Sequence, residues 1–437
     1  MRDPQARVII QENDVIRHLR EALLPEHPLL SSQAKQWVES GLLISFEFTE
    51  PCLLKSPRVP FVSSPEEWCD AQLFDAAKLT LSLLESANEF KADLKDASAW
   101  NVIFNGCTPV FCDLTSLEPL STHAWWAAGQ FVRHFISPLW LARETSLKTH
   151  DIFRMFRDGA SPEIVRGVLG WRRFFSRCWP LIAHPIDASV KAKLGKQASD
   201  KTIKYRQNLI TSLRWMLDGV EPPAINSTIW VNYTEERQHY LALTIEKKRQ
   251  LVAQWLNSLK PRWTLDLGCN TGEFSRIAMD SGSKVIALDG DHDVIQKLYL
   301  DQSDSNSIYP ILSSLDDIHS GRGWGGAEHI GLVKRLEDCA DLVMMLALIH
   351  HLSIAAAIPL EEVARFAATC TRRWLVVEWL EPSDPQVLKL CTQRRREADQ
   401  FSVSRQRQAF VDAGFVLLRE ASLTPGQRIL ALLEKRS

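Results

Sequence analysis

Residues 264–289 contain the pattern that most restricts how this chain folds. An apolar segment, 264–267, runs directly into the turn 268–272 (Gly-Cys-Asn-Thr-Gly), after which a helix is expected to begin near Glu273. A second apolar segment, 284–288, follows this helix and ends on Asp289. A strand, a glycine turn, a helix and a second strand in this order predict neighbouring parallel strands of an open α/β sheet.

The turn and the acid that follows it are typical of a pocket for an adenosine-bearing ligand. Gly268 and Gly272 allow the backbone to approach a ligand closely, and Asn270 belongs to the few residue types that tolerate a positive φ. Asp289 lies 23 positions after Asp266, where a carboxylate can accept hydrogen bonds from both hydroxyls of a ribose. One alternative is that the glycines serve packing only. The other is a dinucleotide ligand, but this requires Gly-x-Gly-x-x-Gly, a spacing that the turn lacks.

The run Leu-Asp-Leu-Gly-x-Asn-Thr-Gly, followed by a strand and an acid, resembles the first two motifs of class I S-adenosylmethionine-dependent methyltransferases. The resemblance implies S-adenosylmethionine as the cofactor and a cofactor-binding set of Asp266, Gly268, Asn270, Gly272 and Asp289. In such proteins the third strand often ends in an acid that reaches the adenine amino group. Here Ser313 and Ser314 occupy that place and Asp316 follows, so the adenine contact is expected from Ser314, Asp316 or the backbone.

The rest of the C-terminal half alternates between two kinds of pattern. Strands are predicted at 264–267, 284–289, 308–313, 341–348, 374–379, 414–419 and 427–433, and helices at 273–281, 291–300, 358–371, 384–398 and 404–413. This alternation predicts a Rossmann-like α/β fold with a mostly parallel seven-stranded sheet covered on both faces. The last two strands match the reversed terminal hairpin of class I methyltransferases, and the helices between 384 and 413 could cap the site.

Two histidines are candidate catalytic residues. The predicted fourth strand runs into His350 and His351, and its carboxyl end faces the space where the cofactor methyl group and an acceptor would meet. A histidine can take a proton near neutral pH, which methyl transfer requires only if the acceptor is a hydroxyl or a protonated amine. Alternatively, one histidine caps the next helix and the other packs beneath the cofactor. His350 is the first choice as base. The two residues are adjacent and no cysteine joins them, so no metal site is predicted.

The N-terminal half has a different pattern. We predict a mainly helical α+β domain at 1–218, a linker at 219–228 with two prolines, and the methyltransferase domain at 229–437. The first 60 residues are expected to form a helix before two short strands, 42–48 and 52–54.

Residues 93–116 resemble the catalytic loop and metal-binding aspartate of the protein-kinase and aminoglycoside-phosphotransferase superfamily. Asp96 and Asn101 are five apart, and two short strands around an Asn-Gly turn then lead to Asp113. The departures are Leu94-Lys95 in place of His-Arg or His-Gly, and the lack of a glycine-rich phosphate loop and of a convincing strand lysine in residues 1–70. This half is therefore interpreted as a kinase-like relic kept for structure or substrate binding.

Composition narrows the function classes further. The chain has 437 residues and a net charge of −2. Its overall charge therefore does not attract it to nucleic acid or to an anionic membrane. Nine cysteines without a Cys-x-x-Cys pair suit a reducing cytoplasm. No signal peptide or membrane-spanning run is evident, so we expect a soluble cytoplasmic protein that does not contact membranes.

Further segments resemble one bacterial group of class I methyltransferases that is related to a host-specific nodulation protein. They lie at 94–104, 130–139, 346–352 and 378–387, so the resemblance covers nearly the whole chain. It implies methyl transfer to an oxygen or nitrogen of a small molecule, a glycan or a biosynthetic intermediate. RNA or protein methylation is an alternative that draws on arginines at 372, 373, 394–396, 405 and 407. A further alternative is a non-catalytic module that binds the cofactor or a partner.

Overall fold

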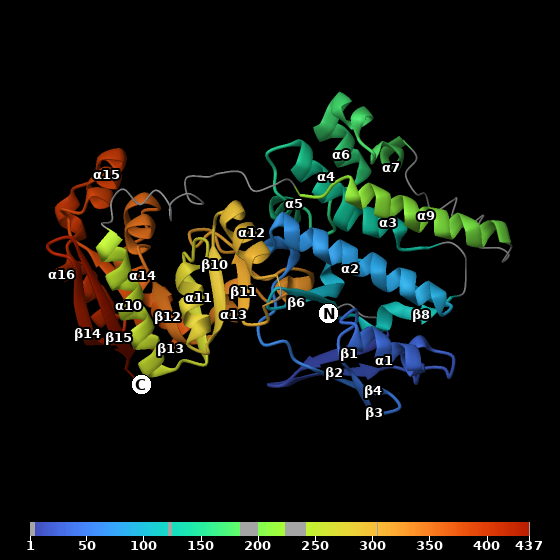
Figure 1. Cartoon of the computed structure of the whole chain (residues 1–437), viewed down its shortest axis with the longest axis horizontal. Coiled ribbons are helices and arrows are strands. Elements are labelled where there is room, and N and C mark those ends of the chain that lie inside the picture. The colour runs from blue at the N-terminus through green and yellow to red at the C-terminus, as the bar shows by residue number, and fades with distance from the viewer. Residues whose placement is uncertain (1–4, 121–124, 184–199, 223–241, 304, 437) are drawn as a thin grey trace. The chain divides into compact units, whose positions relative to one another are not determined.

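The computed structural model of this chain describes all residues except 1–4, 121–124, 184–199, 223–241, 304 and 437 (Figure 1). The chain divides into two compact units, residues 1–225 and 226–437. Of the predicted linker 219–228, residues 223–228 lie outside the described part. Within the described residues, no helix is long and apolar enough to cross a membrane.

The C-terminal unit is built on one sheet with the strand order β11-β10-β9-β12-β13-β15-β14. The strands are β9 (Trp263–Leu267), β10 (Lys284–Asp289), β11 (Ile308–Leu312), β12 (Ala340–Met345), β13 (Thr371–Leu380), β14 (Phe415–Thr424) and β15 (Arg428–Lys435). Strands β9 to β13 run parallel to one another, and β15 runs antiparallel to both β13 and β14. The sheet therefore ends in a reversed hairpin, and its seven strands lie where the sequence predicts strands.

The parallel strands form the core of this unit. Nearly every residue of β9, β10, β11 and β12 is buried. Because side chains of a strand alternate between the two faces, continuous burial means that both faces of the sheet are covered. The covering helices are α10 (Ala242–Leu259), α11 (Glu273–Asp280), α12 (His292–Asp301), α13 (Leu332–Leu336), α14 (Leu360–Cys370), α15 (Pro385–Arg394) and α16 (Val403–Asp412).

The register of the strands fixes where a ligand can bind. Leu267 of β9 is level with Leu288 of β10 and with Met345 of β12. From β9 the chain first adds β10 and β11 on one side and then crosses to β12 on the other side. The loops after β9, β10 and β12 therefore open at one edge, at the point where the strand order reverses. Open α/β sheets bind their ligands at such a point.

The N-terminal unit begins with an antiparallel sheet, not with the expected helix. Its strand order is β1-β2-β4-β3, from strands β1 (Ala6–Ile10), β2 (Asp14–Leu19), β3 (Glu47–Glu50) and β4 (Leu53–Pro57). The prediction of a helix is thus wrong for residues 6–19. The β-branched residues at 8–10 and 15–16 pack well on a pleated surface, and the tight turn between them carries no glycine to reveal it.

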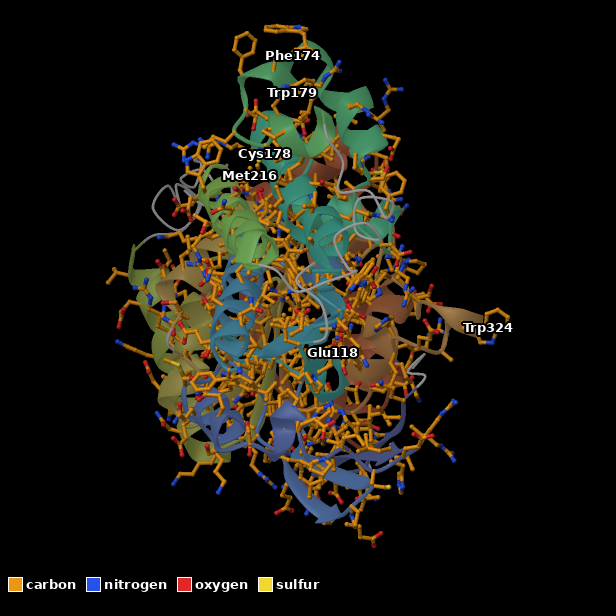
Figure 2. The ribbon with its side chains drawn as sticks, turned by 90° about the vertical axis from the view of Figure 1, so that its right-hand side faces the viewer. Glu118, Phe174, Cys178, Trp179, Met216 and Trp324 are labelled. Atoms are coloured by element: carbon orange, nitrogen blue, oxygen red, sulfur yellow. The ribbon has the colours of Figure 1, made fainter. Side chains whose placement is uncertain are left out.

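The rest of this unit is mainly helical. The long helix α2 (Asp70–Glu89) is followed by the pair β5 (Ala92–Leu94) and β8 (Leu117–Pro119), which encloses the hairpin of β6 (Val102–Asn105) and β7 (Thr108–Phe111). Further helices are α1 (Ser32–Glu39), α3 (Ala128–Phe131), α4 (Ser137–Glu144), α5 (Thr149–Met155), α6 (Pro162–Leu169), α7 (Trp179–Ala183) and α9 (Asp200–Asp218). The rings of Phe174 and Trp179 lie with their centroids 4.5 Å apart and their planes tilted by 50°. The Cys178 sulfur lies 3.7 Å from the Met216 backbone oxygen, in the same region of the unit (Figure 2).

Candidate functional site

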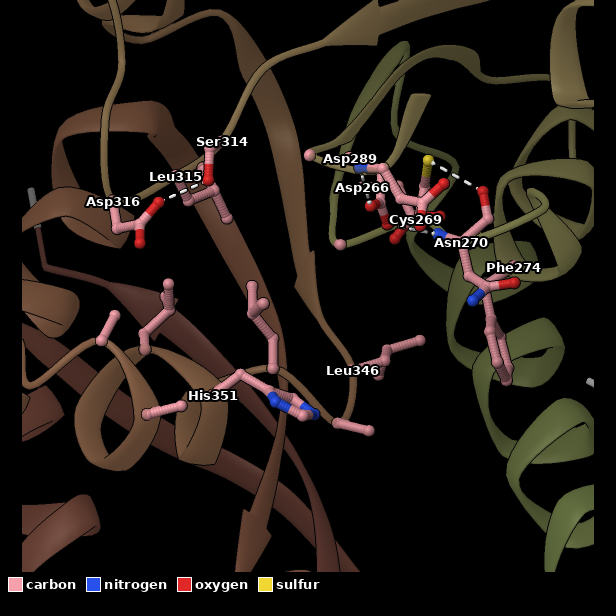
Figure 3. A pocket seen from close by; sticks show the side chains of 18 of the residues that line it. Asp266, Cys269, Asn270, Phe274, Asp289, Ser314, Leu315, Asp316, Leu346 and His351 are labelled. Atoms are coloured by element: carbon pink, nitrogen blue, oxygen red, sulfur yellow. Dashed lines mark hydrogen bonds between the residues drawn. The ribbon is translucent and has the colours of Figure 1, made fainter. Parts of the chain in front are cut away.

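A cavity of about 510 Å³ opens at the carboxyl ends of β9, β10, β11 and β12 (Figure 3). Its volume lies within the range of about 300–1,000 Å³ that is usual for small-molecule sites. Of the residues predicted from the sequence, this pocket brings together Asp266, Gly268, Asn270, Asp289, Ser314, Asp316 and His351. Gly272 and His350 do not line it.

The turn after β9 has the left-handed backbone that its residue types predict. Gly268, Asn270 and Gly272 have φ values of 72°, 51° and 79°. A Cβ on Gly268 would lie 3.1 Å from a methyl carbon of Leu348, so the turn packs closely against the loop after β12. A Cβ on Gly272 would overlap the Leu298 side chain, and Gly272 stands immediately before α11. Gly268 thus borders the pocket, whereas Gly272 serves the packing of α11 against α12.

Asp289 joins the end of β10 to the glycine turn. Its Oδ2 accepts a hydrogen bond from the backbone N–H of Asn270 at 2.9 Å, and its Oδ1 accepts one from the N–H of Asp291 at 3.0 Å. Burial raises the pKa of this carboxyl, while the backbone donors lower it. An ionised carboxylate has about four lone-pair sites, so acceptor capacity remains on the side that faces the pocket.

Asp266, at the end of β9, lies deeper than Asp289. Its side chain is buried and accepts a hydrogen bond from the Ser275 hydroxyl of α11 at 2.6 Å. Burial raises the pKa of Asp266 to about 6, and the Ser275 hydrogen bond opposes that rise. Asp266 thus fixes α11 to the sheet, and part of the residue also lines the pocket.

Ser314 and Asp316 occupy the third loop of the pocket. The Ser314 hydroxyl donates a hydrogen bond to the Asp316 carboxylate, and both residues face the cavity (Figure 3). The neighbouring Ser313 N–H donates to the Asp289 backbone oxygen at 2.9 Å, which holds this loop beside the end of β10. Their contact with an adenine ring stays a prediction. Further along the same segment, Trp324 is 79% exposed and projects away from the unit (Figure 2).

The two adjacent histidines have different surroundings. β12 ends at Met345, and after a short turn the π-helical segment His351–Ala355 begins. His351 lines the pocket, whereas His350 is 1% exposed. Among the described residues neither ring nitrogen of His350 has a hydrogen-bond partner. The first choice from the sequence as base is therefore the histidine that packs beneath the pocket wall.

Burial keeps both imidazoles neutral near pH 7. It lowers the pKa of His351 to about 4, and the Arg428 charge adds to this effect. Burial also places the pKa of His350 well below its ordinary value, with a further lowering by His351. The two rings lie with their centroids 4.2 Å apart. A neutral His351 at the wall has a ring lone pair that can take a proton, and its pKa of about 4 makes it a weaker base than an exposed histidine.

A chain of buried charges, which the sequence does not reveal, lies beneath this wall. Lys248 of α10 donates to Glu378 of β13 at 2.5 Å. Arg428, at the start of β15, donates to Glu378 at 3.1 Å and to Asp384 at 2.6 and 3.1 Å. All four residues are at most 5% exposed. Lys248 also reaches the pocket and lies 4.8 Å from the ring centre of Phe274. The arginine that immediately precedes the apolar run 429–433 is a sequence signal that could have pointed to this network.

In the N-terminal unit, the kinase-like residues have local partners. The Asp113 carboxylate accepts hydrogen bonds from the hydroxyls of Thr115 at 2.8 Å and Ser116 at 2.6 Å, and Asp96 accepts one from the Ser98 N–H at 3.0 Å. Burial raises the pKa of Asp96, and the Asp113 charge contributes. Across the described part of the chain, no three His, Cys, Asp or Glu side chains form a group that could hold a metal ion. The resemblance of this unit to kinases stays a prediction.

Comparison with known proteins gives one protein that is similar over most of the chain, and a set of similar solved structures. No protein-family model matches the chain. The chain is 28% identical over 419 residues to nodulation protein NoeA of Rhizobium meliloti (strain 1021), a match that covers 90% of this chain and 86% of that protein.

Two of the similar solved structures are bacterial methyltransferases. Magnesium protoporphyrin IX methyltransferase of Synechocystis PCC 6803, solved with bound S-adenosylmethionine, matches 49% of this chain and 100% of its own, with 14% identity and a TM-score of 0.33. N-methyltransferase NodS of Bradyrhizobium japonicum WM9 matches 44% and 97%, with 10% identity and a TM-score of 0.32. Similarity at this level does not extend to substrates or to the roles of residues. The strand order of the sheet, its reversed terminal hairpin and the pocket at the β9–β12 reversal give the described residues of the C-terminal unit the fold of the class I S-adenosylmethionine-dependent methyltransferases.

Proposed function

We propose that this chain is an S-adenosylmethionine-dependent methyltransferase that methylates an oxygen or nitrogen of a small molecule, a glycan or a biosynthetic intermediate. The observation that carries the proposal is the position of the Asp289 carboxylate. Two backbone N–H groups hold its carboxylate at the pocket edge, beside a left-handed turn that leaves no Cβ in the way at Gly268. A ribose with two free hydroxyls suits the acceptor capacity that remains.

The charged residues that line the pocket suit a cationic methyl donor. Five carboxylate residues line the pocket, namely Asp266, Glu273, Asp289, Asp291 and Asp316, against two cationic ones, Lys248 and Arg394. Lys248 is paired with Glu378, and Glu273 is paired with Arg249. When bound, S-adenosylmethionine supplies a sulfonium-activated methyl group. The acidic wall would attract and orient that positive charge, and the pocket would hold an acceptor in line with the methyl group.

His351 is the residue that we assign to proton removal. Its side chain faces the pocket and its lowered pKa keeps it neutral at physiological pH. In contrast, two of the arginines that could favour RNA have partners within the unit. Arg407 pairs with Glu420, and Arg405 donates to the Gln400 backbone oxygen. These two arginines therefore give no specific support to RNA methylation.

Binding and transfer by the wild-type protein test the proposal directly. We expect calorimetry to detect one binding event for S-adenosylmethionine and one for S-adenosylhomocysteine. Incubation with the tritium-methyl cofactor and the small-molecule fraction of a cell extract should then label an acceptor. Binding without labelling would support a cofactor-binding module, and a lack of affinity for both compounds would refute the proposal.

We expect His351→Gln to lower the turnover at saturating cofactor by about 100-fold or more, the usual contribution of a general base. The control is His350→Gln, which changes a residue behind the wall and should affect stability more than turnover. A base acts in its deprotonated form, and burial lowers the pKa of His351 to about 4. Wild-type turnover should therefore show no loss from His351 protonation between neutral pH and pH 5, and should fall only as the pH approaches 4. Equal turnover of both variants and the wild type would remove the base assignment.

A further inference from the structure

The end of α15 places one arginine at the pocket. Arg394 is the last residue of this helix, and its side chain lines the cavity. Arg395 then adopts the left-handed conformation, with φ at 54°, and the Arg396 N–H bonds back to the Cys391 oxygen at 2.9 Å. Because such a cap ends the helix abruptly, the three successive arginine side chains do not follow the helical spacing and have different surroundings.

A second contact fixes this helix end against the catalytic side of the pocket. The Arg396 guanidinium donates to the Ser353 backbone oxygen at 3.0 Å, which ties the end of α15 to the segment His351–Ala355. The same segment carries His351, the base that we assign. Arg394 and His351 are therefore held on elements that are directly bonded to each other, and both face one cavity.

Arg394 differs from the other cation of the pocket in having no internal partner. Lys248 is buried and bound to Glu378. Arg394 is exposed, and within the described residues its guanidinium has no hydrogen-bond or ion-pair partner. The carboxylates of the pocket come from the segments 266–291 and 314–316, whereas the wall near Arg394 contains the apolar residues Leu352, Ala355 and Ala356.

We propose that the methyl acceptor carries a carboxylate or phosphate group and that Arg394 binds this group. The inference rests on the proposed methyltransferase function and adds a substrate class to it. A guanidinium offers a planar fork of N–H donors that matches carboxylate and phosphate oxygens in pairs. An anion seated there would lie against the apolar wall, with its neutral part toward His351 and its charge away from the acidic cofactor side. Arg394 would attract the anionic acceptor and the pocket carboxylates would attract the cationic cofactor, so each ligand would bind on its own side of the pocket.

The test uses the full chain, tritium-methyl S-adenosylmethionine and the small-molecule fraction of a cell extract separated by anion exchange. We expect the labelled acceptor to come from the retained fractions. With that fraction as acceptor, Arg394→Gln should raise the half-saturating concentration by about tenfold, and Arg394→Lys by less, since lysine keeps the charge but not the fork. Inorganic phosphate should compete with the acceptor for the wild type and lose that effect in Arg394→Gln.

The matched control is Arg395→Gln, which removes the same charge from the next residue, one that does not line the pocket. Its half-saturating concentration should stay within about twofold of the wild type. Affinity for S-adenosylmethionine, measured by calorimetry, should be the same in all these proteins.

An acceptor that passes the anion-exchange column unretained, or an Arg394→Gln variant with unchanged acceptor saturation, would overturn the inference while leaving the methyltransferase function intact. Loss of cofactor affinity in Arg394→Gln would also overturn it, because the arginine would then serve the cofactor carboxylate. Failure of the wild type to bind the cofactor or to label any fraction would instead count against the proposed function.

Discussion

Asp289→Ala is expected to weaken the binding of S-adenosylmethionine by about 100-fold or more. In the proposed function, Asp289 accepts two hydrogen bonds from the ribose hydroxyls, and each bond to a charged group contributes about 1.5–3 kcal/mol. The variant also releases the Asn270 N–H, which Asp289 holds at 2.9 Å, and so loosens the turn that borders the pocket. Calorimetric titration of the wild type and the variant would measure the effect.

The control for this variant is Glu273→Gln. Glu273 also lines the pocket and also carries a negative charge, but its carboxylate is paired with Arg249. If the acidic wall acted only through its total charge, both variants would lose the same affinity. We expect less than about threefold loss for Glu273→Gln, as is usual for a partly exposed ion pair. Equal affinities of Asp289→Ala and the wild type would contradict the assignment of the ribose site.

The sheet and the glycine turn could be predicted because their signals are local. A parallel strand that is buried on both faces appears as a continuous apolar run, as in residues 285–288. The positive φ of Asn270 follows from the residue type, and the end of β10 at Asp289 follows from the change in polarity. The N-terminal hairpin at 6–19 has weaker signals, because its turn contains neither glycine nor proline.

The orientation of side chains around the pocket could not be predicted in the same way. His351 lines the pocket and His350 is buried behind it, although their ring centroids lie only 4.2 Å apart. The choice between them depends on the backbone after β12, where Ala347 has a φ of 51°. Arg394 reaches the pocket from the end of α15, a helix that buries Val387 and Cys391 and whose end bonds to the Ser353 backbone oxygen through Arg396. Such choices are made by tertiary packing, which leaves no periodic trace in the sequence.

The buried charge network is the clearest case of information that exists only in three dimensions. Arg428 and Glu378 are 50 residues apart, and Lys248 and Glu378 are 130 apart. They meet because β15 pairs antiparallel with β13 in a register that sets Arg428 opposite Leu380. A shift of one residue would turn Arg428 to the other face of the sheet. The network therefore contributes to the choice of register for the terminal hairpin.

Arg428→Met should lower the free energy of unfolding by about 3–5 kcal/mol, since breaking a buried pair leaves uncompensated charge. Methionine keeps much of the volume of the side chain, so the loss would come mainly from Glu378 and Asp384, which are almost fully buried. Denaturant unfolding at neutral pH would measure it. The control is Arg373→Met on the neighbouring strand β13. Arg373 forms an exposed ion pair with Glu434, which should contribute less than about 1 kcal/mol.

A second variant separates lost charge balance from lost packing. Asp384→Asn, added to Arg428→Met, removes one of the unpaired charges, while the amide oxygen can still accept the hydrogen bond that the Gln386 N–H gives to the start of α15 at 2.8 Å. We expect the double variant to regain part of the lost stability. The cost of Arg428→Met should also shrink on acidification, because a carboxylate left buried without its cation has a raised pKa and becomes neutral as protons bind. A double variant that is less stable than Arg428→Met, or a cost that does not change with pH, would mean that Arg428 stabilises the sheet through packing and not through its two carboxylates.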